Sequence, residues 1–171
     1  FHIFSGSQSL RLDAIIESQS HSIELAMRLA GDSPLAVRHV NIGGGLGIPY
    51  FPGEARIDPA PMGAHLAEWL PRLAQALPQA RLALEMGRYL VGEAGVYVAR
   101  VIDRKVSRGE VFLVLDGGMH HHLAASGNLG QVIRKNYPVA IGNRMDPRAA
   151  EGEGAGLASA TGPLCTPLDI L

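Results

Sequence analysis

Cysteine is nearly absent from this sequence, since Cys165 is the single one among 171 residues. One thiol excludes an internal disulfide framework, and we expect a reducing, cytoplasmic location. An excess of charge of one sign is also missing, because the formal net charge is -1 and no basic run alternates with aromatic residues. These absences argue against a nucleic-acid partner. No apolar stretch reaches the length of a membrane span and no signal-peptide pattern opens the chain, so no membrane partner is expected.

A hydrophobic share of 47% over 171 residues is enough for a real core in one domain or in parts of two. The first residue is Phe1 rather than Met, and residues 168–171 end in an apolar, strand-like context. We therefore expect a fragment of a longer chain.

Strand-like and helical segments alternate through the first half of the chain. Residues 1–4 read as the end of a strand, and apolar positions then recur at helical spacing from Leu12 to Ala30. A strand over about 36–42, a helical region around 66–77 and a short strand over 81–85 follow. Pro71 predicts a kink, or two short helices, in the second helical region. The alternation indicates a parallel α/β arrangement with its chemistry at the carboxyl ends of the strands.

Glycines dominate the stretch 41–50, directly after a predicted strand. Without Cβ atoms, Gly43, Gly44 and Gly45 let backbone N–H groups converge on an anion, as a phosphate site requires. The dinucleotide fingerprint is not met, because Ile48 stands where its third glycine belongs, and no Lys-Ser/Thr pair follows. The pattern predicts a phosphate cradle for another cofactor, with a glycine-rich turn as the alternative.

Helical periodicity largely ends near Gly95. Residues 96–103 and 110–116 read as two strands joined by the turn-rich stretch 104–109, which predicts a hairpin of an antiparallel sheet. An exposed loop over 145–156 and a last strand over 158–165 follow. The sequence thus predicts two domains, 1–94 and 95–171.

Four stretches in this order, 1–6, 43–50, 85–89 and 162–165, resemble the pyridoxal-phosphate-dependent decarboxylases of the alanine-racemase-like barrel class. This family includes the diaminopimelate and ornithine decarboxylases, and the glycine stretch is most similar to the diaminopimelate branch. The resemblance implies the C-terminal part of a (β/α)8 TIM-type barrel followed by the start of an antiparallel β-sandwich. It also implies pyridoxal 5'-phosphate as cofactor and a homodimer with shared active sites.

The resemblance assigns the cofactor's ring to two residues. His2 corresponds to an imidazole that stacks on the pyridine ring, and the alternative is a hydrogen-bonded core histidine. Glu85 corresponds to the carboxylate that keeps the pyridine nitrogen protonated, which makes the ring a better electron acceptor. An ordinary salt bridge between Glu85 and Arg88 is the alternative for that pair.

The cofactor's phosphate is assigned by the same resemblance. Ser5 would contribute a hydroxyl and Gly45, with Gly43 and Gly44, backbone N–H groups, whereas turn chemistry is the alternative for each. Arg88 can reach the phosphate with charge-assisted hydrogen bonds.

Two further candidates lie in the second half of the chain. In the resembled family, the residue at Cys165 reaches into the neighbouring subunit's site and helps to protonate the product; by default such a cysteine is an inert core residue. Asp116 matches a strand-end aspartate that can face the substrate's distal group, and a turn cap for Gly117 and Gly118 is the alternative.

The chain departs from the family pattern at several positions. Met86 replaces a usual proline, and Thr166 replaces an acidic residue that contacts a distal ammonium, which casts doubt on diamino substrates. Three consecutive histidines, His120, His121 and His122, would point to alternate faces of a strand and are poor joint metal ligands. No metal is predicted, and a substrate-facing or interface patch is the expectation for these histidines.

Lysine is scarce: Lys105 and Lys135 are the two present, and neither ends a barrel strand. A pyridoxal enzyme needs an amine for its cofactor, and in the resembled family this lysine lies near the N-terminal side of the barrel. The resemblance therefore implies a lysine upstream of Phe1, and the fragment should be inactive alone. The predicted function is decarboxylation of an amino acid, free or carrier-bound. The alternatives are an amino-acid racemase or epimerase on the same fold, and a non-catalytic decarboxylase homologue.

Overall fold

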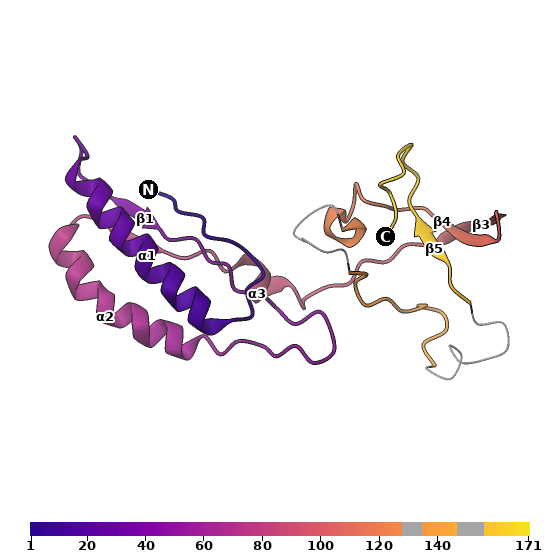
Figure 1. Ribbon diagram of the computed structural model, residues 1–171, viewed down its shortest axis with the longest axis horizontal. Coiled ribbons are helices and arrows are strands. Elements are labelled where there is room, and N and C mark those ends of the chain that lie inside the picture. Colours follow the sequence, from indigo (N-terminus) through magenta and orange to yellow (C-terminus); the bar gives the residue numbers. More distant parts are fainter. Residues whose placement is uncertain (128–134, 147–155) are drawn as a thin grey trace. The chain divides into compact units, whose positions relative to one another are not determined.

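The computed structural model describes residues 1–127, 135–146 and 156–171. They form two compact units, Phe1–Gly95 and Val96–Leu171 (Figure 1). The elements in chain order are α1 (Leu12–Gly31), β1 (His39–Asn41), α2 (Ala60–Ala76), β2 (Arg81–Ala83), α3 (Gly87–Val91), β3 (Val101–Ser107), β4 (Glu110–Leu115), the 3-10 helix η1 (Leu123–Ser126) and β5 (Ser159–Thr161).

The first unit is built on parallel pairing of three segments. β1 pairs with β2 in the register Asn41 to Ala83, and on its other side Asn41 forms a parallel bridge with His2. Backbone bonds continue beyond the strands, since the Glu85 N–H donates to the Gly43 carbonyl at 2.8 Å. The predicted α/β alternation is confirmed, and the carboxyl ends of the three segments meet at one edge.

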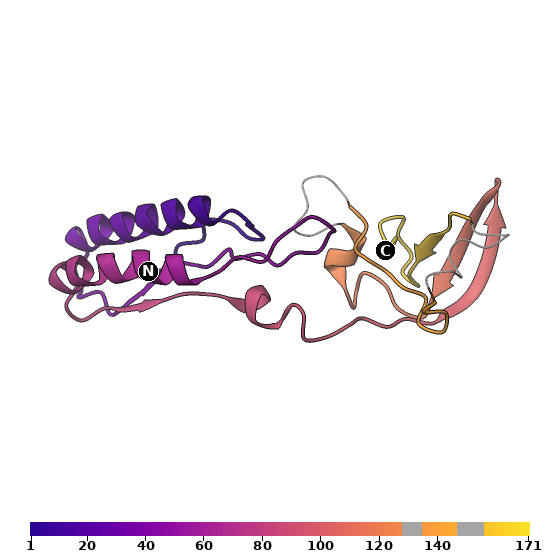
Figure 2. The ribbon, with the colours of Figure 1, turned by 90° about the horizontal axis from the view of Figure 1, so that it is seen from below.

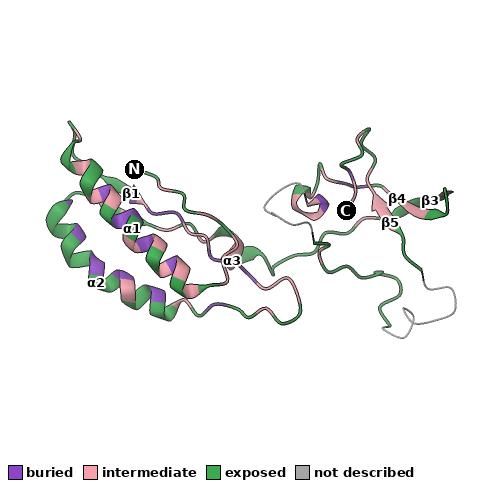
Figure 3. Ribbon diagram, in the orientation of Figure 1, coloured by how far each residue is buried: buried purple, intermediate pink, exposed green. Residues whose placement is uncertain are grey.

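Helices α1 and α2 lie side by side and pack on these strands (Figure 2). Their buried faces, purple along both helices in Figure 3, meet the strands in one apolar cluster. Its buried members are Ile23, Ala26, Val40, Ile42, Leu66, Trp69, Leu73 and Leu77. Because side chains alternate along a strand, Val40 and Ile42 face the helices while Asn41 faces away from them. The helix packing therefore leaves one face of the strands for polar side chains.

Pro71 lies within α2, which runs without interruption from Ala60 to Ala76. The alternative of two short helices is therefore wrong. Proline lacks an N–H donor, but α2 buries an apolar stripe that includes Met62, Leu66, Trp69 and Leu73, and such packing stabilises a helix more than a single backbone bond does.

The second unit begins with the predicted hairpin. β3 and β4 pair antiparallel, and the turn consists of Arg108 and Gly109, with φ of 54° and 85°. Two positive φ angles match the tight turn that suits strand twist, so the strand continues to Ser107. The expected turn over 104–109 was too long, and the first strand begins at Val101 rather than at residue 96.

The third strand of this sheet does not pair antiparallel as the first two do. β5 pairs with β4 in parallel, which gives the order β3-β4-β5. The expected antiparallel sheet is therefore a mixed one over the described strands. Thr161 also forms an antiparallel bridge with Ile170, so the chain returns along β5 after a loop.

None of the helices in the described ranges is long and apolar enough to cross a membrane. The expected loop over 145–156 lies mostly outside the described residues, as does the stretch between Gly127 and Lys135.

Candidate active site

Three polar side chains come together at the carboxyl ends of the parallel segments. Asn41 ends β1, Glu85 follows β2, and His2 lies on the neighbouring segment. They share the face of the strands opposite the helices, and the His2 and Glu85 side chains are 56% and 52% exposed. The structure thus brings together the two residues that the sequence assigned to the cofactor's ring.

One oxygen of Glu85 lies close to both neighbours. Asn41 Nδ2 donates to Glu85 Oε1 at 2.7 Å, and His2 Nε2 lies 3.2 Å from the same oxygen. Asn41 Oδ1 in turn accepts the Gly43 N–H at 2.9 Å. The amide of Asn41 therefore links the glycine loop to the carboxylate. Sequence reasoning missed Asn41, although a polar residue between an apolar strand and the glycines was a usable signal.

Arg88 does not pair with Glu85 among the described residues, so the predicted alternative of a salt bridge between them is wrong. Its Nη1 donates to Gln8 Oε1 at 2.9 Å, and the guanidinium lies 5.9 Å from the centre of the Tyr50 ring. Gln8, also missed from sequence, bonds the backbone of Ile48 through both ends of its amide. Arg88 is thereby held next to the glycine loop while its other N–H groups stay available for an anion.

The glycines are required first by close packing. A Cβ atom at Gly44 would overlap the carbonyl oxygen of Glu85, and one at Gly43 would lie 2.6 Å from the Ile3 carbonyl oxygen. Gly43 and Gly45 also have φ of 71° and 87°, which disfavour any side chain. The loop therefore lies directly against both neighbouring strand ends.

The same loop offers backbone donors. The Gly43 N–H is used by Asn41, whereas the N–H groups of Gly44 and Gly45 have no hydrogen-bond partner within the described part of the chain. Two adjacent unpaired donors at a strand end suit a phosphate oxygen. Of the three glycines predicted to bind phosphate, Gly44 and Gly45 have the free donors.

Polar side chains on α1 and on the segment before it lie near the glycine loop. Ser5 Oγ lies 3.2 Å from Ser22 Oγ on α1. One turn earlier, Gln19 is 3% exposed, and both polar atoms of its amide lack partners among the described residues. Ile15 and Ile23 on either side of Gln19 join the clusters that contain Leu46 and Ile42, so Gln19 faces the glycine stretch between them. Buried unpaired amide groups are costly, and they fit a site that binds a polar group.

These observations fit a cofactor with a phosphate at one end and a basic ring at the other. The Gly44 and Gly45 N–H groups, the Ser5 hydroxyl and the Arg88 guanidinium can hold the phosphate. Glu85 and His2 can face the ring. Within the described residues, no three His, Cys, Asp or Glu side chains converge as a metal site would require.

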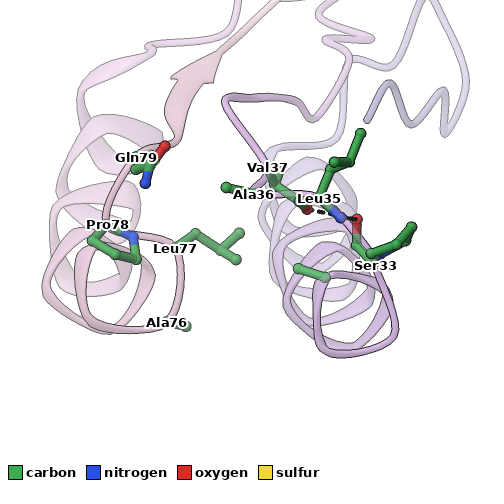
Figure 4. A pocket seen from close by; sticks show the side chains of 10 residues that line it. Ser33, Leu35, Ala36, Val37, Ala76, Leu77, Pro78 and Gln79 are labelled. Carbon is green, nitrogen blue, oxygen red and sulfur yellow. Dashed lines mark hydrogen bonds between the residues drawn. The ribbon is translucent and has the colours of Figure 1, made fainter.

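A separate pocket of about 300 Å³ lies at the other end of the first unit (Figure 4). Leu35 and Val37 line it before β1 begins, and Leu77 and Gln79 line it before β2 begins. It therefore opens at the amino ends of the strands. No ionisable side chain is among its lining residues, and it is unconnected with the chemistry described above.

In the second unit, Cys165 is exposed in the loop after β5, so the alternative of an inert core cysteine is wrong. Asp116 does not cap the two following glycines, because its Oδ1 accepts the Arg100 N–H at 2.8 Å. The predicted turn cap is therefore replaced by a bond that ties the strand end to the segment before β3. Asp116 remains exposed.

The three histidines lie in a turn before η1 rather than on a strand. The rings of His120 and His121 are 3.9 Å apart between centroids, and His122 Nδ1 caps η1 by accepting the Ala125 N–H at 3.1 Å. Tyr97 lies beside them, with its ring 5.7 Å from that of His122. Burial raises the pKa of the Tyr97 phenol, and the charges of nearby carboxylates add to this. The expectation of alternating faces on a strand was wrong because the Gly118 carbonyl accepts the His121 and His122 N–H groups, so the chain turns at the histidines.

Comparison with known proteins agrees with this geometry. The model of the pyridoxal-dependent decarboxylase C-terminal sheet domain matches residues 5–171. The chain belongs to this decarboxylase family. The family predicted from four short motifs is thereby confirmed.

Curated relatives align with as much as 99% of the chain. An L-glutamyl-[BtrI acyl-carrier protein] decarboxylase of Niallia circulans is 40% identical, and a diaminopimelate decarboxylase of Streptomyces coelicolor is 30% identical. The chain spans 39% and 36% of their lengths. It thus corresponds to less than half of either relative.

Solved structures of similar fold include AQ1208 from Aquifex aeolicus, with a TM-score of 0.61 and 25% identity over 99% of this chain and 37% of that one. A diaminopimelate decarboxylase matches with a TM-score of 0.64 at 22% identity, covering 99% of this chain and 37% of that one. At that identity the second likeness concerns the fold alone.

The packing of the glycine loop generates a stability prediction. Gly44→Ala should destabilise the protein by about 3 kcal/mol or more, because its Cβ overlaps a backbone oxygen that cannot rotate away. Gly63→Ala is the matched control: Gly63 lies in α2 with no atom near its Cβ position, so alanine should stabilise by about 0.5–1 kcal/mol. Denaturant unfolding of both variants measures the difference, and equal midpoints would contradict the close approach of Gly44 and Glu85.

Proposed function

We propose that the protein containing this chain decarboxylates an amino acid with pyridoxal 5'-phosphate. In this proposal residues 1–94 are the C-terminal portion of a (β/α)8 barrel and residues 95–171 begin a β-sandwich domain. Family membership supports it, as do the parallel strands whose carboxyl ends gather the polar residues. The face of β1 that carries Asn41 would then line the barrel interior.

The observation that carries the proposal is the position of Glu85. Its carboxylate accepts from Asn41 and lies beside His2, next to a glycine loop in which two N–H donors have no partner within the described ranges. An acceptor held in this way favours a proton on a ring nitrogen placed against it. When bound, the cofactor supplies the electron-withdrawing ring that takes up the electrons left by the departing carboxylate.

Each remaining residue has a proposed part. Gly44, Gly45, Ser5 and Arg88 bind the phosphate and thereby set the depth of the cofactor in the site. His2 packs on the ring, and its neighbour Glu85 keeps the imidazole oriented. The amine for covalent attachment comes from a lysine elsewhere in the longer protein, so residues 1–171 alone are inactive in this proposal.

Glu85 also favours a decarboxylase over the two alternatives, a racemase of the same fold and a non-catalytic homologue. A racemase of the same fold would place arginine rather than glutamate at the ring nitrogen, which leaves the ring a weaker electron acceptor. A non-catalytic homologue would lack the lysine in the longer chain. Both rivals predict no CO₂ release.

The first test replaces this carboxylate in the full-length protein. Glu85→Ala should keep most cofactor binding but lower the rate of CO₂ release by about 100-fold or more, because one preorganised electrostatic contact is lost. Glu24→Ala, an exposed carboxylate on α1, is the control and should leave the rate unchanged. Cofactor absorbance and CO₂ release are measured, with chirality of recovered substrate as the check for racemisation. Unchanged turnover in Glu85→Ala would contradict the assigned role.

The substrate is proposed to lack a distal ammonium. Thr166 stands where the resembled family often has an acidic residue, and its Oγ1 accepts the Leu168 N–H at 3.3 Å, so this position offers no anion. The relative from Niallia circulans acts on a glutamyl group attached to a carrier protein, as its name states. We therefore propose a glutamyl-type substrate, attached to a carrier.

A substrate panel tests this choice. Glutamate and a glutamyl-carrier conjugate should be turned over at least about tenfold faster than diaminopimelate, lysine or ornithine, because a distal ammonium would be left unpaired. Thr166→Asp should reduce this preference for glutamyl over diamino substrates, because it restores an anion that can pair with the distal ammonium. Faster turnover of the diamino substrates by the unaltered protein would contradict the proposal.

Cys165 is proposed to complete the site of a neighbouring subunit in a homodimer. Cys165→Ala chains and chains lacking the cofactor-binding lysine should each be nearly inactive. After subunit exchange at equal amounts, about half of the dimers are mixed and each has one complete site, so activity should return to roughly a quarter of that of the unaltered protein.

Mixed dimers are verified by mass before activity is measured. If verified mixed dimers stay inactive, Cys165 does not serve a neighbouring site.

A further inference from the structure

A buried carboxylate joins two loops of the second unit. Asp169 is 2% exposed, and its Oδ1 accepts the Met119 N–H at 2.6 Å while Oδ2 accepts the Leu164 N–H at 2.9 Å. Met119 belongs to the turn that carries the three histidines, and Leu164 directly precedes Cys165. One side chain therefore holds two segments that are distant in sequence.

Two glycines provide the room for this carboxylate. A Cβ atom at Gly118 or at Gly162 would overlap the carboxylate oxygens of Asp169. Neither glycine has a positive φ, so a side chain is excluded there by space and not by backbone conformation. The space between these two glycines is thus occupied by the Asp169 carboxylate.

Backbone hydrogen bonds also hold the loop that carries Cys165. The Gly162 N–H donates to the Asp169 carbonyl at 2.9 Å, and the Thr166 N–H donates to the Leu164 carbonyl at 2.8 Å. Cys165 itself makes no hydrogen bond with the described residues. The place of its thiol therefore depends on the segment on either side of it, and this segment is attached to the histidine turn through Asp169.

We propose that Asp169 is the positioning residue of Cys165. By bonding both Met119 and Leu164, it fixes the cysteine loop against the histidine turn, so that the thiol and the histidines form one prearranged surface. The functional part of this inference rests on the proposed role of Cys165. The attachment of the two loops does not.

Asp169→Asn in the full-length protein tests the attachment. Asparagine keeps the size of the side chain but has one acceptor, and its NH₂ group would face one of the two N–H donors. Exchange of the Met119 and Leu164 amides with deuterium should accelerate by about tenfold or more. Asp103→Asn is the matched control, since Asp103 is exposed on β3 and bonds its own neighbour's N–H. Unaltered exchange at both amides would overturn the attachment.

Gly162→Ala tests the same attachment of the two loops without changing the Asp169 side chain. Its Cβ should displace the carboxylate and accelerate the same two amides. In an Asp169→Ala background the added methyl group meets no carboxylate, so Gly162→Ala should produce no further acceleration. Equal effects in both backgrounds would show that the glycine does not act through Asp169 and would overturn the placement of its carboxylate between the two glycines.

Kinetics separates positioning from a general loss of structure. Asp169→Asn should lower kcat about tenfold or more while KM and cofactor affinity stay within about twofold. In a Cys165→Ala background it should lower kcat no further, because the residue through which it acts is already absent. If Asp169→Asn lowers kcat by the same factor in the Cys165→Ala background as in the unaltered protein, Asp169 has only a structural role and the proposal is overturned. If the unaltered protein releases no CO₂, the proposed function fails, whereas amide exchange still decides the attachment.

Discussion

The first unit depends on the direct contact of a glycine backbone with the ends of two neighbouring strands. Gly44 lies so close to the Glu85 carbonyl that a single methyl group would not fit, and a Cβ atom at Gly43 would lie 2.6 Å from the Ile3 carbonyl oxygen. This approach brings the Glu85 side chain within reach of Asn41, and the Gly44 and Gly45 N–H groups have no partner among the residues that the structure describes. Packing and the proposed phosphate binding thus require glycine at the same positions.

The strands separate structural and chemical roles by the alternation of their side chains. Val40 and Ile42 enter the apolar cluster under the helices, whereas Asn41 between them faces the polar group with His2 and Glu85. A shift of one residue in the pairing of β1 would exchange these roles. The register that secures the core therefore also assembles the site.

The second unit repeats the combination of a carboxylate with glycines. Asp169 occupies the space left by Gly118 and Gly162 and bonds two backbone N–H groups, so a charged side chain is kept in a buried position. Hydrogen bonds of this kind stabilise a buried carboxylate. In the first unit the missing Cβ atoms leave room for a neighbouring backbone. In the second unit they leave room for the Asp169 side chain.

The sequence by itself determined the family, the alternation of strands and helices, the hairpin, and most candidate site residues, because these depend on local patterns and short motifs. Only the tertiary structure decided that Asn41 bonds Glu85, that Arg88 bonds Gln8 and that Asp169 joins two loops. It also decided the parallel pairing of β5 and the turn at the histidines. The bonds between Asn41 and Glu85, between Arg88 and Gln8 and between Asp169 and Met119, like the pairing of β4 with β5, join residues far apart in the chain. Such partners are selected by packing and space, which local patterns do not encode.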